Sequence, residues 1–255
     1  DGGLGGGLEL AALLGSSRAR AHSSRPLPPG IDGLTQREWN ANLYWAWLWS
    51  LKGLSGGPGS AWEDRVLSTT LSSWVHLRSL AALYASEKTI TLTFKPAKPP
   101  VFLEPEAELY ARLLAVVRMA CGGLGSLAVL PPPTATRLQK LEATVERILA
   151  IAESSVPCFE DQAFLRGLVS GSIGARALIR LGEDPGTGEV LQAGTGRVDL
   201  MIVCVRDGGG QLRLAAGPVQ SYYEMRRSRE SVLTESSWEE AKVARPDWVR
   251  SYRRP

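Results

Sequence analysis

Apolar residues recur every three or four positions through most of the first two thirds of the chain. Segments rich in glycine, proline or serine interrupt this spacing, so each apolar run is short enough to form one helix. The pattern predicts an amphipathic helix in each of five stretches, at residues 35–52, 60–87, 105–122, 134–153 and 160–169.

Start signals support the boundaries of three of these helices. Thr35 and Ser60 are each followed three residues later by a glutamate, which is the spacing of a capping box. Pro105 stands at a first helical position, where its missing N–H is tolerated. A short Gly/Pro loop joins the first two helices, so we expect them to pack antiparallel.

Beyond residue 175 the pattern changes to short runs rich in β-branched residues, separated by turn sequences. Asp184–Gly188 and residues 207–210 have the composition of hairpin turns. Residues 89–94 predict one further short strand or extended link, and a last short helix is expected near Thr234, around Trp238. The main strands are predicted at 177–181, 190–193, 198–205 and 212–223.

These elements predict an α+β fold, with a mainly helical body of about five helices followed by a small C-terminal antiparallel β-meander. We expect a single domain over 34–255, helical over 34–170 and β-rich over 175–225. A C-terminal helix and a basic tail then occupy 226–255. A meander of this size is marginal alone, so it should pack on the helices.

Residues 1–33 are rich in glycine, serine and proline, a composition typical of an extended arm or linker. A short apolar patch at 8–14 is long enough for about two turns of helix. Because such a segment buries little apolar surface, we do not expect it to fold independently. If it is ordered, it should lie across the helical body or on another chain.

The bulk composition argues against several classes of protein. The 29 Lys+Arg and 26 Asp+Glu leave a net charge of +3, which is too small for a dedicated nucleic-acid binder. No apolar run reaches the length of a membrane-spanning helix. Two histidines and three widely spaced cysteines, without a C-x-x-C pair, lead us to expect no metal or cofactor.

Tryptophan is concentrated in the first predicted helix, where Trp39 and Trp47 share one stripe and Trp45 and Trp49 share another. At this density some of the rings must face the core. We expect mainly packing, with Trp45 and Trp49 as the candidate partner-binding stripe. The alternative is that exposed rings stack on sugars or on a planar cofactor.

The last 30 residues hold eight basic and five acidic side chains, a surplus equal to the net charge of the whole chain. Arg226, Arg227 and Arg229 begin this segment. They are candidates for contact with an anionic partner or a membrane surface. A solvated tail is the alternative interpretation.

No residue pattern predicts a catalytic centre. His76 has no acidic residue three or four positions away, and His22 falls in the predicted arm. Glu224 follows a strand, but no second carboxylate can be paired with it from the sequence. The glycines between Gly182 and Gly196 precede strands, whereas a phosphate-binding loop precedes a helix, so they predict turns.

Several short segments, taken together and in this order, carry a resemblance to a known family. They are 42–48, 73–78 with 83–85, 103–105 with 109–112, 195–200 leading to 221–224, 233–238 and 245–248. The chain resembles, over roughly 35–255, the bacterial and archaeal family called domain of unknown function 3160. Many members look exported or lipid-anchored. The resemblance therefore implies the fold and an extracytoplasmic or cell-envelope location, with a cytoplasmic one as the alternative, but no reaction.

The departures from the family pattern concern four positions. Where the family has His and Asp in the second helix, this chain has Ser79 and Leu80. Where the family has Asp and His before the turn at 184, this chain has Arg180 and Gly182. If those four groups form a metal or acid–base site in the family, only a degenerate site remains here.

We therefore expect a non-enzymatic structural or interaction protein, a subunit or accessory component of an extracytoplasmic assembly. Its partners would be other protein subunits, with the basic tail available to an anionic or membrane surface. The alternative is a cell-envelope hydrolase or carbohydrate-binding protein that uses the aromatic helix and Glu224.

Overall fold

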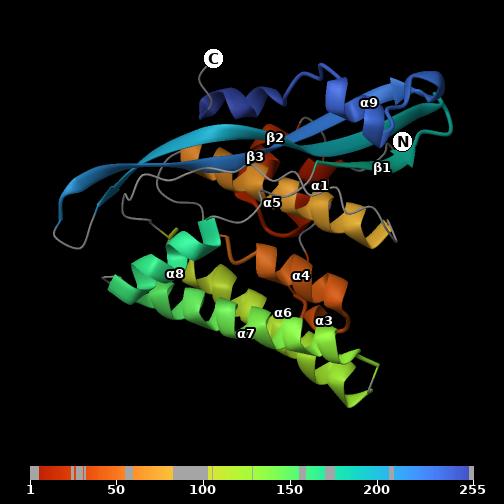
Figure 1. Ribbon diagram of the computed structural model, residues 1–255. Helices are drawn as coiled ribbons and strands as arrows, with labels where there is room; N and C mark the ends of the chain where they lie inside the picture. Colours follow the sequence, from red (N-terminus) through yellow and green to blue (C-terminus); the bar gives the residue numbers. More distant parts are fainter. Residues whose placement is uncertain are drawn as a thin grey trace.

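The computed structural model describes residues 6–23, 26, 31, 33–54, 60–82, 103–104, 106–127, 129–154, 159–169, 176–206 and 210–252. Its helices are α1 Gly7–Leu13, α2 Ser17–His22, α3 Gln36–Trp39, α4 Leu43–Leu51, α5 Ser60–Ala82, α6 Ala107–Ser126, α7 Pro132–Glu153, α8 Phe159–Val169 and α9 Glu235–Glu240, with 3-10 helices η1 Arg229–Ser231 and η2 Asp247–Ser251. Helices α1 and α5 lie against the sheet, and α3, α4, α6, α7 and α8 form a further layer (Figure 1). The expected strand at 89–94 lies outside the described residues.

The three strands β1 Ala177–Glu183, β2 Glu189–Arg206 and β3 Leu212–Ser228 form an antiparallel sheet in the order β1-β2-β3. This arrangement is a meander, and it confirms the α+β prediction. The strands expected at 190–193 and 198–205 are one continuous strand, β2, because a bulge between Thr195 and Val198 shifts the register without ending the pairing. Gly196 has a φ of +119°, which lets the strand kink there.

The turn between β1 and β2 forms as its sequence predicts. The Asp184 carboxylate accepts hydrogen bonds from the backbone N–H groups of Gly186 and Thr187, at 2.8 and 3.3 Å. Gly188 has a φ of +70° and donates its N–H to the Asp184 carbonyl at 2.8 Å. The glycines here therefore serve a hairpin.

One face of the sheet carries the main core. Cross-strand partners point to the same face, so Ala177, Thr195 and Tyr222 share it, as do Ile179 and Ala193. These residues pack against α1, α2 and α5. Besides the sheet, the buried apolar residues of this cluster are Ala11, Ala12, Leu14, Ala19, Trp39, Leu48, Leu51, Leu67, Leu71, Trp74 and Val75.

Over residues 6–23 the N-terminal segment is ordered and lies across the body of the domain, one of the two placements expected for an ordered segment. Helices α1 and α2 contribute Ala11, Ala12 and Ala19, each fully buried, to the main core. Small side chains bury little area, but they let the helix backbones approach α5 and the sheet closely. The segment therefore packs on the body of the domain and does not form an independent unit.

The other face of the sheet carries a smaller core under α9. Trp238 is 2% exposed, lies edge-on to Tyr223 with ring centroids 5.1 Å apart, and packs with Met225. Its indole N–H donates to the Thr195 carbonyl at 3.2 Å. Thr234 caps α9 through the Ser237 N–H, which confirms the short helix expected there.

In the helical layer two boundaries differ from prediction. The helix expected over 35–52 is divided into α3 and α4, because Asn42 has extended backbone and caps α4 by accepting from Trp45 N–H at 3.0 Å. Helix α6 continues through Gly122 and Gly123 to Ser126. A helical glycine costs only about 1 kcal/mol, and packing against α7 offsets that cost.

Helix α4 packs on α6 more extensively than on α5, contrary to the expected antiparallel pair. After α4, a Cβ at Gly53 would lie 2.7 Å from the backbone nitrogen of Leu109, so glycine permits this close approach. A hydrogen bond from Trp74 Nε1 to Tyr44 Oη, at 3.1 Å, still links α5 to α4.

Candidate functional site

Asp64, on α5, is a fully buried carboxylate that joins three distant parts of the chain. Arg18 of α2 donates from Nη2 to both carboxylate oxygens at 2.8 Å and from Nε to Oδ1 at 3.0 Å. His22 Nε2 lies 2.5 Å from the same Oδ1. Arg18 and His22 are four residues apart, so one face of α2 presents both side chains to α5. We call Arg18, His22 and Asp64 the Asp64 clamp.

The C-terminal segment closes over the Asp64 clamp. Trp248 of η2 stacks on His22 with ring centroids 5.8 Å apart, and on Tyr222 at 6.5 Å. The Ser251 hydroxyl adds a hydrogen bond to Asp64. The clamp thus ties the N-terminal helices and the C-terminal 3-10 helix to the central helix α5.

Burial raises the pKa of the Asp64 carboxyl, but hydrogen bonds from Ser251, His22 and Arg18 outweigh burial and lower it below its usual value. The carboxylate therefore stays ionised at neutral pH, and the His22 Nε2–H donates to it. This arrangement orients an imidazole whose side chain is 21% exposed.

Glu224 holds helix α1 in place. Its Oε2 accepts from the Gly7 backbone N–H at 2.7 Å and from the Tyr222 hydroxyl at 2.5 Å. Burial and the Glu224 charge raise the Tyr222 pKa well above its usual value, so the phenol remains a donor. Glu224 is therefore a structural tie, whereas the hydrolase alternative would need it free to face a substrate.

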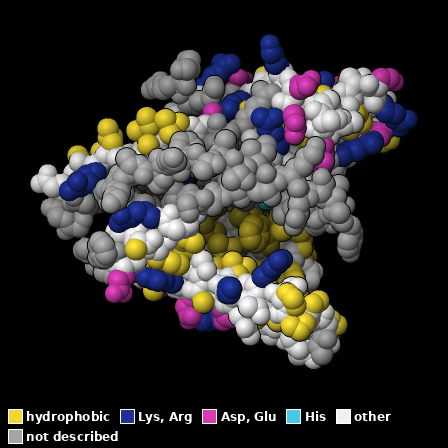
Figure 2. Space-filling view, viewed as in Figure 1, with side chains coloured by type: hydrophobic (Ala, Val, Ile, Leu, Met, Phe, Trp, Pro, Cys, Tyr) yellow, Lys and Arg dark blue, Asp and Glu magenta, His cyan; other side chains and the backbone are white. Residues whose placement is uncertain are grey.

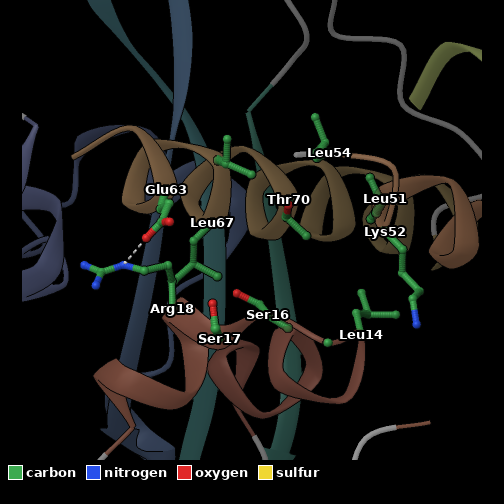
Figure 3. Close-up of a pocket in the computed structure, with 13 residues that line it drawn as sticks. Leu14, Ser16, Ser17, Arg18, Leu51, Lys52, Leu54, Glu63, Leu67 and Thr70 are labelled. Carbon is green, nitrogen blue, oxygen red and sulfur yellow. Dashed lines mark ion pairs between the residues drawn. The ribbon is translucent and has the colours of Figure 1, made fainter. Parts of the chain in front are cut away.

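A cleft of about 310 Å³ lies between the α1–α2 turn, α5 and the end of α4. Leu14, Leu51 and Leu67 supply apolar wall, and Ser16 and Thr70 supply hydroxyls (Figure 3). At one side Arg18 and Glu63 form an ion pair at 3.5 Å (Figure 3). Arg18 is already held by Asp64, so the charge of this wall is neutralised from within the protein.

The predicted aromatic stripe is only half exposed. Trp45 packs edge-on to the buried Trp39, with ring centroids 5.5 Å apart. Arg112 of α6 lies over the Trp49 ring at 4.8 Å and donates to the Trp49 carbonyl at 2.8 Å. Much of this stripe therefore serves the packing of α4 against its neighbours.

The three arginines proposed for an anionic partner lie at the end of β3 and in η1. Arg226 and Arg229 are exposed, whereas Arg227 is half-buried. Arg229 donates from Nε to Glu183 at 2.9 Å. One of the three charges is therefore paired within the chain, which weakens the patch as an anion site.

Two positions of the degenerate family site, Ser79 and Arg180, lie on opposite sides of the sheet. Ser79 is buried on α5, on the side of the sheet that carries Ile179. Arg180 follows Ile179 in β1, so it points to the opposite face, where it is exposed and pairs with Glu183. Gly182 faces Leu191 beside a bulge, and the Leu80 side chain lies outside the described residues.

A feature that the sequence analysis missed is an apolar surface on the far half of the sheet. Pairing of β1 with β2 ends at Thr195, so β2 and β3 continue as a two-stranded extension, the β-arm, formed by residues 198–206 and 212–220. Its exposed face presents four large apolar side chains: Leu200 at 71%, Ile202 at 63%, Leu212 at 64% and Leu214 at 77% exposed.

The β-arm projects beyond the helices that cover the rest of the sheet (Figure 1). Hydrophobic side chains gather along its upper surface in the space-filling view (Figure 2). At its root, Arg245 forms an ion pair with Asp199 and lies over the Tyr223 ring at 5.2 Å. The base of the arm is therefore tied to the C-terminal segment, while its apolar face remains exposed.

The described part of the chain contains neither a cluster of metal-ligating side chains nor a membrane-spanning helix. No group of three or more His, Cys, Asp or Glu side chains there is placed to hold a metal ion. Among the helices described, none has the length and apolar character to cross a bilayer.

The comparison with known proteins identifies the family of this chain but assigns no function. Neither the curated proteins nor the solved structures gave a match to this chain. Residues 6–158 and 182–249 match the family described as "Protein of unknown function (DUF3160)". The match covers most of the chain, confirms the resemblance carried by the sequence motifs, and extends it to α1 and α2. The chain therefore belongs to the DUF3160 family.

Proposed function

We propose that this protein is a non-enzymatic structural subunit that binds a protein partner through the exposed face of the β-arm. The observation that carries this proposal is the set of four large apolar side chains, 63–77% exposed, on one face of two paired strands. Contiguous apolar surface of several hundred Å² on a folded protein usually marks an interaction site.

The polar clusters support a structural role. In the Asp64 clamp the carboxylate, the guanidinium and the imidazole bind one another, and they tie distant segments together. Glu224 is likewise engaged by Gly7 and Tyr222. These contacts stabilise the scaffold that presents the β-arm.

The partner is another protein subunit, because an apolar face on two paired strands suits a protein surface of matching shape. The assembly that we propose lies outside the cytoplasm, and this part of the proposal rests on the family resemblance alone. Fractionation of the native host, with the chain detected by antibody, tests the compartment.

Site-specific photo-crosslinking in the native host tests the partner. A photo-reactive residue in place of Leu214 should give one discrete protein adduct that mass spectrometry identifies. Leu127, which is 69% exposed at the end of α6, is the matched control and should not give that adduct. Introducing Ile202→Lys should abolish the adduct at position 214. Adducts with lipid only, or none, would overturn the proposal.

A further inference from the structure

We infer that the partner on the β-arm is a second copy of this chain, packed face to face about a twofold axis that runs along the arm. This inference rests on the proposed function and names the partner. It follows from the charge of the exposed face, from the arrangement of large and small side chains on it, and from its area.

Seven adjacent exposed positions of the face are uncharged, and they are Leu200, Ile202, Cys204, Leu212, Leu214, Ala216 and Pro218. The one charged residue in register with them is Arg206, which pairs with Leu212 at the end of the arm. Complementary charges usually select a different partner and set its orientation. Here the seven side chains offer no charge for such selection. Interfaces between identical subunits are also more apolar than those between transient partners.

Large side chains on one strand lie opposite smaller ones on the other. Ile202 pairs with Ala216, and Leu214 pairs with Cys204. With a twofold axis along the arm, β2 of one copy lies over β3 of the other. Each Ile202 then meets the Ala216 position of the second copy, and each Leu214 meets the Cys204 position. At these two pairs, the middle of the face is therefore complementary in shape to itself.

The area is close to the minimum for a specific dimer. Four side chains of leucine size, each exposed by about two thirds, offer roughly 350 Å² of apolar surface. The smaller neighbours raise this to about 500 Å² per copy, or about 1,000 Å² for the pair, the lower limit for a specific interface. We therefore expect a reversible dimer, with a dissociation constant in the micromolar range.

Sedimentation equilibrium of the purified chain, from about 1 to about 100 micromolar, measures the association. The unaltered chain should pass from monomer to dimer over this range. Ile202→Lys and Ala216→Glu, each alone, should raise the dissociation constant at least tenfold. Circular dichroism should show both variants folded, because both side chains are exposed. Leu127→Lys, far from the arm, should dimerise normally.

Mixing the two variants tests the geometry. A mixture of Ile202→Lys and Ala216→Glu should recover a dimer, because the twofold axis along the arm places the introduced ammonium of one copy against the introduced carboxylate of the other. Recovery with Ile202→Lys plus Ile202→Glu, and not with the first mixture, would mean that the axis crosses the arm and would overturn this arrangement.

The outcome separates this inference from the proposed function. If the purified chain stays monomeric while position 214 crosslinks to a different polypeptide in cells, the second copy is excluded and the proposed function stands. If the chain is monomeric and position 214 crosslinks to no protein, both fail.

Discussion

The most informative perturbation is Asp64→Asn, which removes the charge at the centre of the Asp64 clamp while keeping the shape of the side chain. The new amide would place N–H donors against the Arg18 guanidinium in a position that is 1% exposed. Breaking a buried ion pair on one side costs about 3–5 kcal/mol. Arg18 is 24% exposed and regains some water, so we expect a loss at the lower end of that range, about 3 kcal/mol.

Urea unfolding at pH 7, followed by circular dichroism and by tryptophan fluorescence, measures this loss. With a slope of about 3 kcal/mol/M, the midpoint should fall by about 1 M. The matched control is Glu63→Gln on the same helix, because Glu63 is 37% exposed and its ion pair with Arg18 is longer, at 3.5 Å. An exposed pair contributes at most about 1 kcal/mol.

Two further results would identify the cause of the Asp64→Asn effect. Trypsin should cut α2 after Arg18 or Arg20 faster in Asp64→Asn, because the clamp holds that helix. Adding Arg18→Gln to Asp64→Asn should cost less than the sum of the single changes, since it removes the unpaired charge. A urea midpoint of Asp64→Asn no lower than that of Glu63→Gln would refute this reasoning. Fully additive stability losses of Asp64→Asn and Arg18→Gln in the double variant would also refute it.

Three further measurements test the Asp64 clamp and the core. The folded-state pKa of Asp64 lies below the ordinary 3.8, so the ionised carboxylate stabilises the fold above that pH. This stabilisation is lost as the pH falls toward the lowered pKa. The melting temperature of Asp64→Asn should therefore fall less than that of the unaltered chain between about pH 5 and pH 3. Gly194→Ala would put a Cβ 2.6 Å from the Trp238 ring and should cost about 1–3 kcal/mol by thermal unfolding, whereas Gly217→Ala in the same sheet, with open space around it, should cost far less. Tyr222→Phe removes the hydroxyl that donates to Glu224, the carboxylate that holds α1, and should lower stability by about 1–2 kcal/mol in the same assay. An unchanged melting temperature would show that this hydrogen bond does not stabilise the fold.

Local structure could be predicted from the sequence because its causes are local. The capping box at Thr35, the cap at Thr234 and the turn at Asp184 each depend on residues within a few positions, and all three formed as expected. Apolar spacing located the five main helices and the meander for the same reason. Errors arose where packing overrode local preference, as at Gly122 in α6.

The sites depended on contacts between distant residues. Arg18 and His22 stand in a segment with the composition of a linker, and 46 and 42 residues separate them from Asp64. Only the folded chain shows that α2 packs on α5 and that small alanines there fill the core.

The exposed face of the β-arm could not be predicted either, because its exposure also depends on residues far away in the sequence. Alternate residues of its strands are apolar on both faces, so periodicity alone identified a strand but not which face is covered. The position of the helices, which end before the arm, decided that Leu200, Ile202 and Leu214 are exposed.

The sequence by itself determined the helices, turns and strands, because capping, hydrogen-bonding and turn preferences act between residues that are close in the chain. Tertiary structure decided which polar groups are buried together and which apolar face remains uncovered, because burial depends on surfaces that residues far apart in the sequence supply.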